Sequence, residues 1–236
     1  MNRNMVLGLL AVATSGFSSA ALADWTGKGE LGGSFASGNS ENEAVNAALA
    51  LNYASGDWKH MLGFAGNYGN DGNVATAQRW ELRGQSNYSF TERAYGFGAG
   101  RYEDDRFSAY DYQASIAGGL GYRIIDTEQT KFWVQGGPGY RFAKLLESGE
   151  SEDGLIFRGD LGLDHQLTET TKIVERFLVE AGSDNTYLQN DLGLEVAING
   201  TLALRLGYQV RHNTNEVPGT EKTDTLVTVG LIYEMK

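Results

Sequence analysis

Residues 110–124 alternate between two kinds of position, and this pattern constrains the fold more than any other feature of the chain. The even positions are apolar, aromatic or small, whereas the odd positions include Asp111 and Arg123. Side chains of a β-strand alternate between its faces, so this segment has one apolar and one polar face. It is longer than an ordinary strand of about 5–6 residues and suits the roughly 9–11 residues that cross a bilayer. With Tyr110 and Tyr122 near its ends, it is predicted to be a transmembrane β-strand.

The same alternation recurs after residue 24 and predicts about twelve strands. In the strand expected near 94–103, the apolar face carries Tyr95, Phe97 and Ala99. The strand expected at 171–181 has the weakest pattern, because Val174 and Leu178 fall on its polar face. We therefore expect one long, strand-rich domain without a linker or helical segment.

The connections between the predicted strands alternate in length. Those after the second, fourth, sixth, eighth and tenth strands are short and lie at 55–57, 90–93, 126–130, 168–170 and 199–201. Those after the fifth, seventh and eleventh are longer and acidic and include 103–105, 147–153 and 215–222. Short periplasmic turns and longer external loops are typical of outer-membrane barrels.

The N-terminus predicts an exported protein. Arg3 precedes an apolar run, and Ala21 and Ala23 supply small residues before a cleavage site, so residues 1–23 are predicted to be a cleaved signal peptide and 24–236 the mature domain. The apolar run is too short for the ~20 residues of a spanning helix. A net charge of −11 argues against nucleic acid as a partner.

A soluble β-sandwich is the alternative fold, since it also shows a period of two. Its strands are shorter and its apolar faces are buried against each other. Here nearly every predicted strand exceeds about ten residues, and Tyr and Trp favour the strand ends. We therefore predict an all-β fold, a single antiparallel transmembrane β-barrel of about twelve strands, closed because an unpaired sheet edge cannot lie in hydrocarbon.

Several short motifs resemble one known family. They are Gly29-Glu30-Leu31-Gly32, Tyr102-Glu103-Asp104-Asp105-Arg106-Phe107, Gly119-Leu120-Gly121-Tyr122-Arg123 and Gly136-Gly137-Pro138-Gly139-Tyr140-Arg141. The chain is similar to the salt-induced outer-membrane proteins of Gram-negative bacteria, a family defined by a domain of unknown function. The resemblance implies an outer-membrane barrel and carries over no catalytic residue. Thr228, Gly230, Tyr233 and Met235 resemble the C-terminal signal that the barrel-assembly machinery recognises, although the chain ends in Lys236.

Charges of both signs fall on the polar faces of the strands and are expected to line the lumen. The candidate residues are Arg79, Glu81, Arg83, Asp111, Arg123, Arg141, Arg158, Asp160, Glu195, Arg205 and Arg211. They are either the lining of a narrow selective channel or a static network of ion pairs that fills the lumen. The sequence leaves both interpretations open.

An outer-membrane lipid hydrolase is the rival class, because some twelve-stranded barrels carry a Ser-His site on the lipid face. Of the three histidines, His60 is expected to face lipid with Ser86 nearby, but no orienting acid is evident. The acidic segment 147–153 matches no standard calcium loop, so it is interpreted as a solvated charge run. No catalytic residue, metal site or cofactor is predicted.

The sequence thus predicts a non-enzymatic, porin-like protein of the bacterial outer membrane. Its expected role is envelope integrity or narrow solute passage under osmotic or salt stress, with a small pore for ions or polar solutes as the alternative. Its expected partners are outer-membrane lipids, lipopolysaccharide and, during biogenesis, the barrel-assembly machinery.

Overall fold

A computed structural model describes residues 25–37, 42–71, 74–215 and 221–235. The predicted signal peptide, residues 38–41 and 72–73, most of the predicted connection 215–222, and Lys236 lie outside this part of the chain. The strands are β1 (Trp25–Ser37), β2 (Asn42–Ser55), β3 (Trp58–Asp71), β4 (Val74–Ser89), β5 (Ala94–Asp105), β6 (Tyr110–Asp126), β7 (Thr130–Leu145), β8 (Gly154–Gln166), β9 (Thr171–Gly182), β10 (Thr186–Ala197), β11 (Leu202–Asn213) and β12 (Thr223–Met235). No helix in the described part of the chain is long and apolar enough to cross a membrane.

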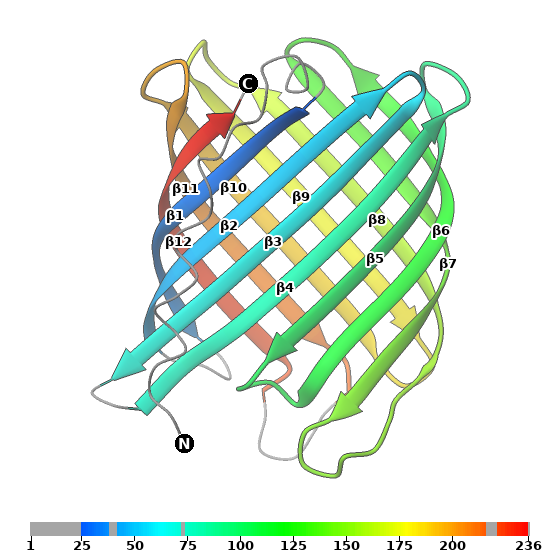
Figure 1. Cartoon of the computed structure of the whole chain (residues 1–236), viewed down its shortest axis with the longest axis vertical. Coiled ribbons are helices and arrows are strands. Elements are labelled where there is room, and N and C mark those ends of the chain that lie inside the picture. The colour runs from blue at the N-terminus through cyan, green and yellow to red at the C-terminus, as the bar shows by residue number, and fades with distance from the viewer. Residues whose placement is uncertain (1–24, 38–41, 72–73, 216–220, 236) are drawn as a thin grey trace, which may run out of the picture.

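The strands form one closed antiparallel barrel (Figure 1). Each strand pairs with its neighbours in the sequence, and β1 closes the ring by pairing with β12, where Leu31 lies opposite Leu231. Closure pairs every strand on both sides, which leaves no open edge. The predicted twelve-stranded antiparallel barrel is confirmed.

The apolar faces of the strands point away from the lumen. Leu120 and Leu155 are 68% and 77% exposed, and most other large apolar side chains of the alternating pattern are exposed as well. A soluble sandwich would bury these faces against each other. Their outward orientation excludes that alternative and gives the wall an apolar outer band.

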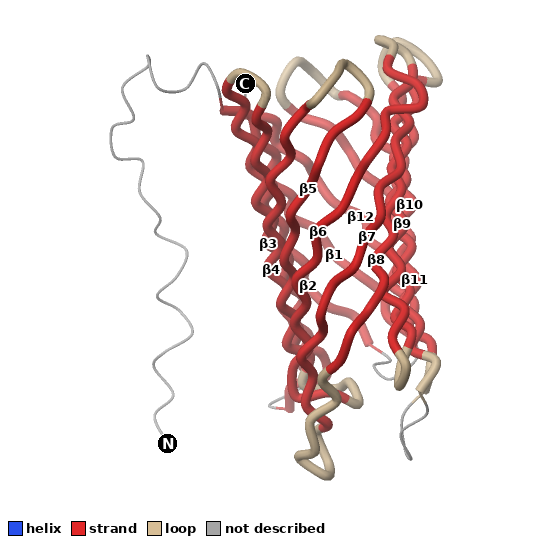
Figure 2. Tube along the Cα trace, turned by 90° about the vertical axis from the view of Figure 1, so that its right-hand side faces the viewer, coloured by secondary structure: helices blue, strands red, loops and turns tan. Residues whose placement is uncertain are grey.

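The two ends of the barrel differ, as Figures 1 and 2 show. We call the end that carries the connections 56–57, 90–93, 127–129, 167–170 and 198–201 the short-turn end; it is drawn at the top of Figure 1. The opposite end, which carries 106–109, 146–153 and the connection between β11 and β12, is the long-loop end. In the two-residue turn between β2 and β3, Gly56 has a φ of 54°, a conformation that glycine adopts without strain.

Aromatic side chains gather on the outer face near both ends. At the short-turn end, Trp25 contacts Tyr53 and Trp58 contacts Tyr88, each with ring centroids 5.0 Å apart. Nearer the long-loop end, Tyr102 lies 5.0 Å from Trp80. Such girdles mark the two membrane–water interfaces of transmembrane barrels.

Strand β5 is turned the opposite way from the prediction. Tyr95 and Phe97 are only 3% and 6% exposed and share the inner face with Arg101 and Glu103. The Tyr95 hydroxyl donates a hydrogen bond to Gln135 at 3.1 Å across the inside of the wall. The prediction that Tyr95, Phe97 and Ala99 form the outer face of this strand is therefore wrong.

A β-bulge changes the face of the first residues of β6. The register of β6 against β7 shifts between Tyr110 and Tyr112, which breaks the alternation there. Tyr110 is consequently buried, and its hydroxyl donates to Glu152 at 2.9 Å. Asp111 is instead exposed and lies 3.6 Å from Lys144 Nζ. The expected outward position of Tyr110 is wrong, and Asp111 does not join the lumen charges.

Candidate functional site

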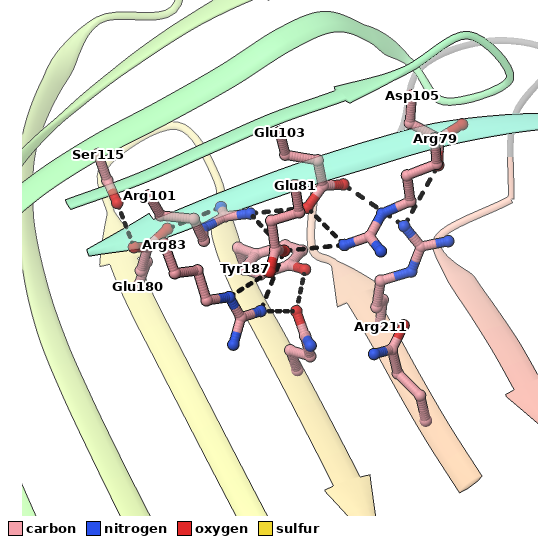
Figure 3. Close-up of polar contacts among 12 residues, drawn as sticks. Arg79, Glu81, Arg83, Arg101, Glu103, Asp105, Ser115, Glu180, Tyr187 and Arg211 are labelled. Carbon is pink, nitrogen blue, oxygen red and sulfur yellow. Dashed lines mark hydrogen bonds and ion pairs between the residues drawn. The ribbon is translucent and has the colours of Figure 1, made fainter. Parts of the chain in front are cut away.

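The inner faces of β4–β6 and β8–β11 carry a continuous set of hydrogen bonds and ion pairs, part of which is drawn in Figure 3. We call this set the lumen network. Its members are Arg79, Glu81, Arg83, Arg101, Glu103, Asp105, Ser115, Arg158, Asp160, Glu180, Tyr187, Gln189 and Arg211.

Glu180 is the most buried carboxylate of the network, with 0% of its side chain exposed. Arg101 Nη2 donates to its Oε2 at 3.0 Å, and Arg158 Nη1 donates to its Oε1 at 3.3 Å. Ser115 Oγ donates to the same Oε1 at 2.5 Å. A carboxylate buried this deeply needs such partners, because an isolated buried charge is very costly.

Glu103 joins two arginines from different strands. Arg79 Nη2 lies 3.0 Å from Glu103 Oε2, and Arg211 Nη1 lies 3.4 Å from Glu103 Oε1. Arg211 Nη1 also lies 3.2 Å from Asp105, near the long-loop end. The Glu103–Asp105 stretch was predicted to be part of an acidic external loop, whereas the structure places it in β5 with Glu103 and Asp105 buried inside.

The lumen network spans the inside of the barrel. Arg101 on β5 reaches Glu180 on β9, and Arg83 on β4 donates to Gln189 on β10 at 2.8 Å. These strands are four or more positions apart around the ring. The network therefore ties opposite parts of the wall together and fills that part of the cross-section.

A second group of charges surrounds Glu195 at the short-turn end. Lys28 Nζ and Lys172 Nζ lie 3.0 and 2.9 Å from Glu195 Oε2, and Arg205 Nη1 lies 3.6 Å from its Oε1. Arg205 also lies 3.7 Å from Glu30. These pairs are more exposed than the Glu180 pairs, since 39% of the Lys28 side chain is accessible.

Beside the lumen network lies a chain of cavities whose lining includes inward residues of β2 and β3, among them the small residues Ala48, Gly63 and Ala65. The largest, about 730 Å³, lies toward the short-turn end and shares Gly63, Arg83 and Arg205 with a cavity of about 260 Å³. The second shares Ala48, Ala65 and Arg79 with a third of about 180 Å³. Shared lining means that these cavities adjoin, and we call the series the side passage.

The side passage narrows toward the long-loop end. A last cavity of about 20 Å³ shares Asn67, Arg79 and Leu226 with the third and is also lined by Asp105 and Arg211. This is room for about one water molecule. We call it the constriction.

Ten of the eleven predicted lumen residues lie on the inner face, and the exception is Asp111. Eight of the ten belong to the lumen network or to the charges around Glu195: Arg79, Glu81, Arg83, Arg158, Asp160, Glu195, Arg205 and Arg211. Arg123 donates to the Glu92 carbonyl at 2.8 Å near the short-turn end, and Arg141 donates to the Asn185 carbonyl at 3.1 Å at the other end.

The sequence prediction missed Arg101, Glu103, Glu180 and Tyr187, which are central to the network. The alternation in β9 already put Glu180 on the same face as Val174 and Leu178, and all three are buried inside. The burial of Val174 and Leu178 confirms the predicted face of that strand. Arg101 and Glu103 were missed because β5 was assigned the wrong faces.

His60 and Ser86, the pair behind the hydrolase alternative, lie on the outer face near the short-turn end. His60 Nδ1 is 2.8 Å from Ser86 Oγ, and its ring stacks on Trp58 with centroids 5.7 Å apart. A catalytic dyad also needs a group that orients the histidine. Within the described residues no carboxylate forms a hydrogen bond with His60, and His60 is part of the aromatic girdle.

The acidic segment 147–153 is more ordered than a solvated charge run. The backbone N–H of Ala143 donates to Asp153 at 3.2 Å, and Asn215 donates to Glu152 at 2.8 Å. In the part of the chain that the structure describes, no group of three or more His, Cys, Asp or Glu side chains is placed to hold a metal ion. These acidic residues therefore attach the loop to its surroundings.

A closed barrel with an apolar outer band, aromatic girdles and a polar lumen defines an outer-membrane β-barrel protein with a porin-like fold. The chain belongs to the family described as Protein of unknown function, DUF481, whose model matches residues 29–235. The predicted family membership is thereby confirmed, while the association with salt remains a prediction.

Two comparisons agree with this assignment. The chain is 24% identical over 205 residues to the uncharacterized protein YdiY of Escherichia coli (strain K12), covering 84% of this chain and 79% of YdiY. It also resembles the NanC porin with a TM-score of 0.57 and 10% identity, covering 88% of this chain and 100% of that one. At this identity the second likeness establishes the fold alone.

Proposed function

We propose that the protein is a narrow outer-membrane channel that passes ions or small polar solutes along the side passage. The observation that carries the proposal is the series of adjoining cavities from the short-turn end to the constriction. Arg79, Arg83 and Arg158 of the lumen network line these cavities, so the network acts as a fixed wall of the passage.

The lining of the side passage favours small hydrophilic solutes. Arg79, Arg205 and Lys28 alternate along it with Glu30 and Asp191. Rings of charged side chains set the selectivity of pores, and a lining with both signs allows ions of either charge to be solvated. The constriction, with room for about one water molecule, excludes larger solutes unless its side chains move.

Planar-bilayer recording on the purified, refolded protein tests the proposal. We expect small discrete current steps, because a narrow polar path conducts weakly. The sample is checked on a gel for the mobility shift on heating that a folded barrel shows. A folded barrel without discrete current would contradict channel function.

A structural role in envelope integrity is the second candidate, and the buried lumen network favours it. Pairs such as Arg101–Glu180, with 1% and 0% of their side chains exposed, brace the wall from inside. The absence of current in the recording would leave this role as the better account.

We place the protein, in this proposal, in the outer membrane with the short-turn end toward the periplasm. The outer band would contact lipids and lipopolysaccharide, and the C-terminal pattern ending in Tyr233 and Met235 would be recognised by the barrel-assembly machinery. Export through a cleaved signal peptide and a role under salt or osmotic stress belong to the same proposal. They are supported by the N-terminal sequence and by the family resemblance. We propose no catalytic activity.

A further inference from the structure

One carboxylate lies on the outer face within the apolar band, four residues from the short-turn end of its strand. Glu175 is the fifth of the twelve residues of β9, and its ladder partners are Leu163 on β8 and Leu192 on β10, both part of the apolar band. Among the described strands it is the only Asp, Glu, Lys, Arg or His that faces outward more than three residues from a strand end. The other outward charges lie near the ends, where water and lipid headgroups are available.

A second polar side chain accompanies Glu175. Asn190 on β10 is also outward, opposite Phe177, and its amide donates a short hydrogen bond to Glu175 Oε1. This bond leaves Glu175 Oε2, the Asn190 Oδ1 and one amide N–H without a partner among the described residues. The pair therefore offers both acceptors and a donor at a depth where hydrocarbon offers neither.

The surroundings restrict what can cover the pair. Lipid headgroups lie at the level of the aromatic girdles, and acyl chains carry no hydrogen-bonding group. A protein surface is then the partner that supplies the missing hydrogen bonds of the pair, since polar side chains hold transmembrane segments together by hydrogen bonds. The flanking outward residues Leu163, Phe177, Leu192 and Tyr208 form an apolar wall suited to such packing.

We propose that the outer face of β9 and β10 around Glu175 and Asn190 is an interface with a second copy of this chain. The pair is self-complementary: about a two-fold axis, the free N–H of Asn190 in one copy meets the Glu175 carboxylate of the other, and the reverse. A two-fold interface uses the same patch on both subunits, so a patch with both donor and acceptor satisfies itself.

Cysteine cross-linking in membranes tests this interface, and the chain contains no native cysteine to interfere. Leu192→Cys puts a thiol beside Glu175, and Leu62→Cys is the matched control because both leucines are outward, at 43% and 50% exposure. Leu62 lies on β3, six positions around the ring from β9 and on the opposite wall in Figure 1. With copper phenanthroline and oxygen as the oxidant, we expect a disulfide-linked dimer of Leu192→Cys and none of Leu62→Cys.

Adding Glu175→Leu and Asn190→Leu to Leu192→Cys is expected to lower the dimer yield at least about fivefold, while the barrel keeps its heat-dependent gel mobility. Equal dimer yield at both cysteines, no dimer at Leu192→Cys, or a cross-link to a protein of another size would overturn the proposal. An unchanged yield in the leucine variant would do the same. If the leucine variant does not fold, the comparison between the two single cysteines decides.

Discussion

Replacing Arg211 by alanine is expected to increase the single-channel conductance about two- to threefold, because this side chain lines the constriction. Arg211 Nη1 lies 3.2 Å from Asp105, and Nη2 lies 3.8 Å from Asp224, so the substitution also removes the cation that neutralises these carboxylates. We therefore expect preference for cations to increase as well. Conductance and reversal potential in planar bilayers under a salt gradient measure the two effects.

Arg106→Ala is the matched control for this experiment. Arg106 lies at the same end of the barrel, but it is exposed and contacts Gln78 at 3.4 Å. Its removal changes the net charge equally without changing the lining that Arg211 provides. Equal conductance in Arg211→Ala and the parent protein would mean that the constriction does not limit the current.

Replacing Glu180 by alanine is expected to lower the free energy of unfolding by about 3–5 kcal/mol. The carboxylate is fully buried between Arg101 and Arg158, at 3.0 and 3.3 Å, so its loss leaves two arginines without their shared partner. Urea unfolding in lipid vesicles, followed by tryptophan fluorescence, measures the change.

Asp164→Ala provides the comparison for Glu180. Asp164 lies 2.8 Å from Arg176, but 37% and 39% of the two side chains are exposed. An exposed pair of this kind contributes at most about 1 kcal/mol. Equal losses in the two variants would show that the lumen network does not stabilise the barrel more than an ordinary ion pair does.

The fold was predictable because its determinants are local. Strand alternation, the lengths of the connections and the aromatic residues near strand ends are all visible in the sequence. They also exclude a sandwich, since a wall whose apolar face meets lipid needs strands long enough to cross it. The pairing of β1 with β12 follows from the requirement that no edge stay open.

The errors in the face assignments have local physical causes. The outward positions of β5 include Gly96, Gly98 and Gly100, so neither face is clearly apolar. Because Tyr95 and Phe97 are aromatic, their face was predicted to be the outer one. At the start of β6, the bulge between Tyr110 and Tyr112 reverses the faces of Tyr110 and Asp111. A bulge of this kind leaves no mark in the pattern of apolar residues.

The lumen network was predictable only in part. Alternation identifies which charges point inward, but the contact of Arg101 with Glu180 joins residues 79 positions apart on strands that are not neighbours. Such contacts depend on the tilt of the strands and on the width of the closed barrel. The side passage could not be predicted for the same reason. It arises where small inward residues such as Ala48 and Ala65 face the lumen network.

The central claim, that solutes cross along β2 and β3 beside the lumen network, is tested most directly by thiol labelling during recording. Ala48→Cys places a thiol in the side passage, and Val45→Cys places one on the outer face of the same strand, where Val45 is 60% exposed. A charged methanethiosulfonate reagent is expected to reduce the current of Ala48→Cys by about half or more and to leave the current of Val45→Cys unchanged. A conducting Ala48→Cys barrel that is labelled without loss of current would contradict the account.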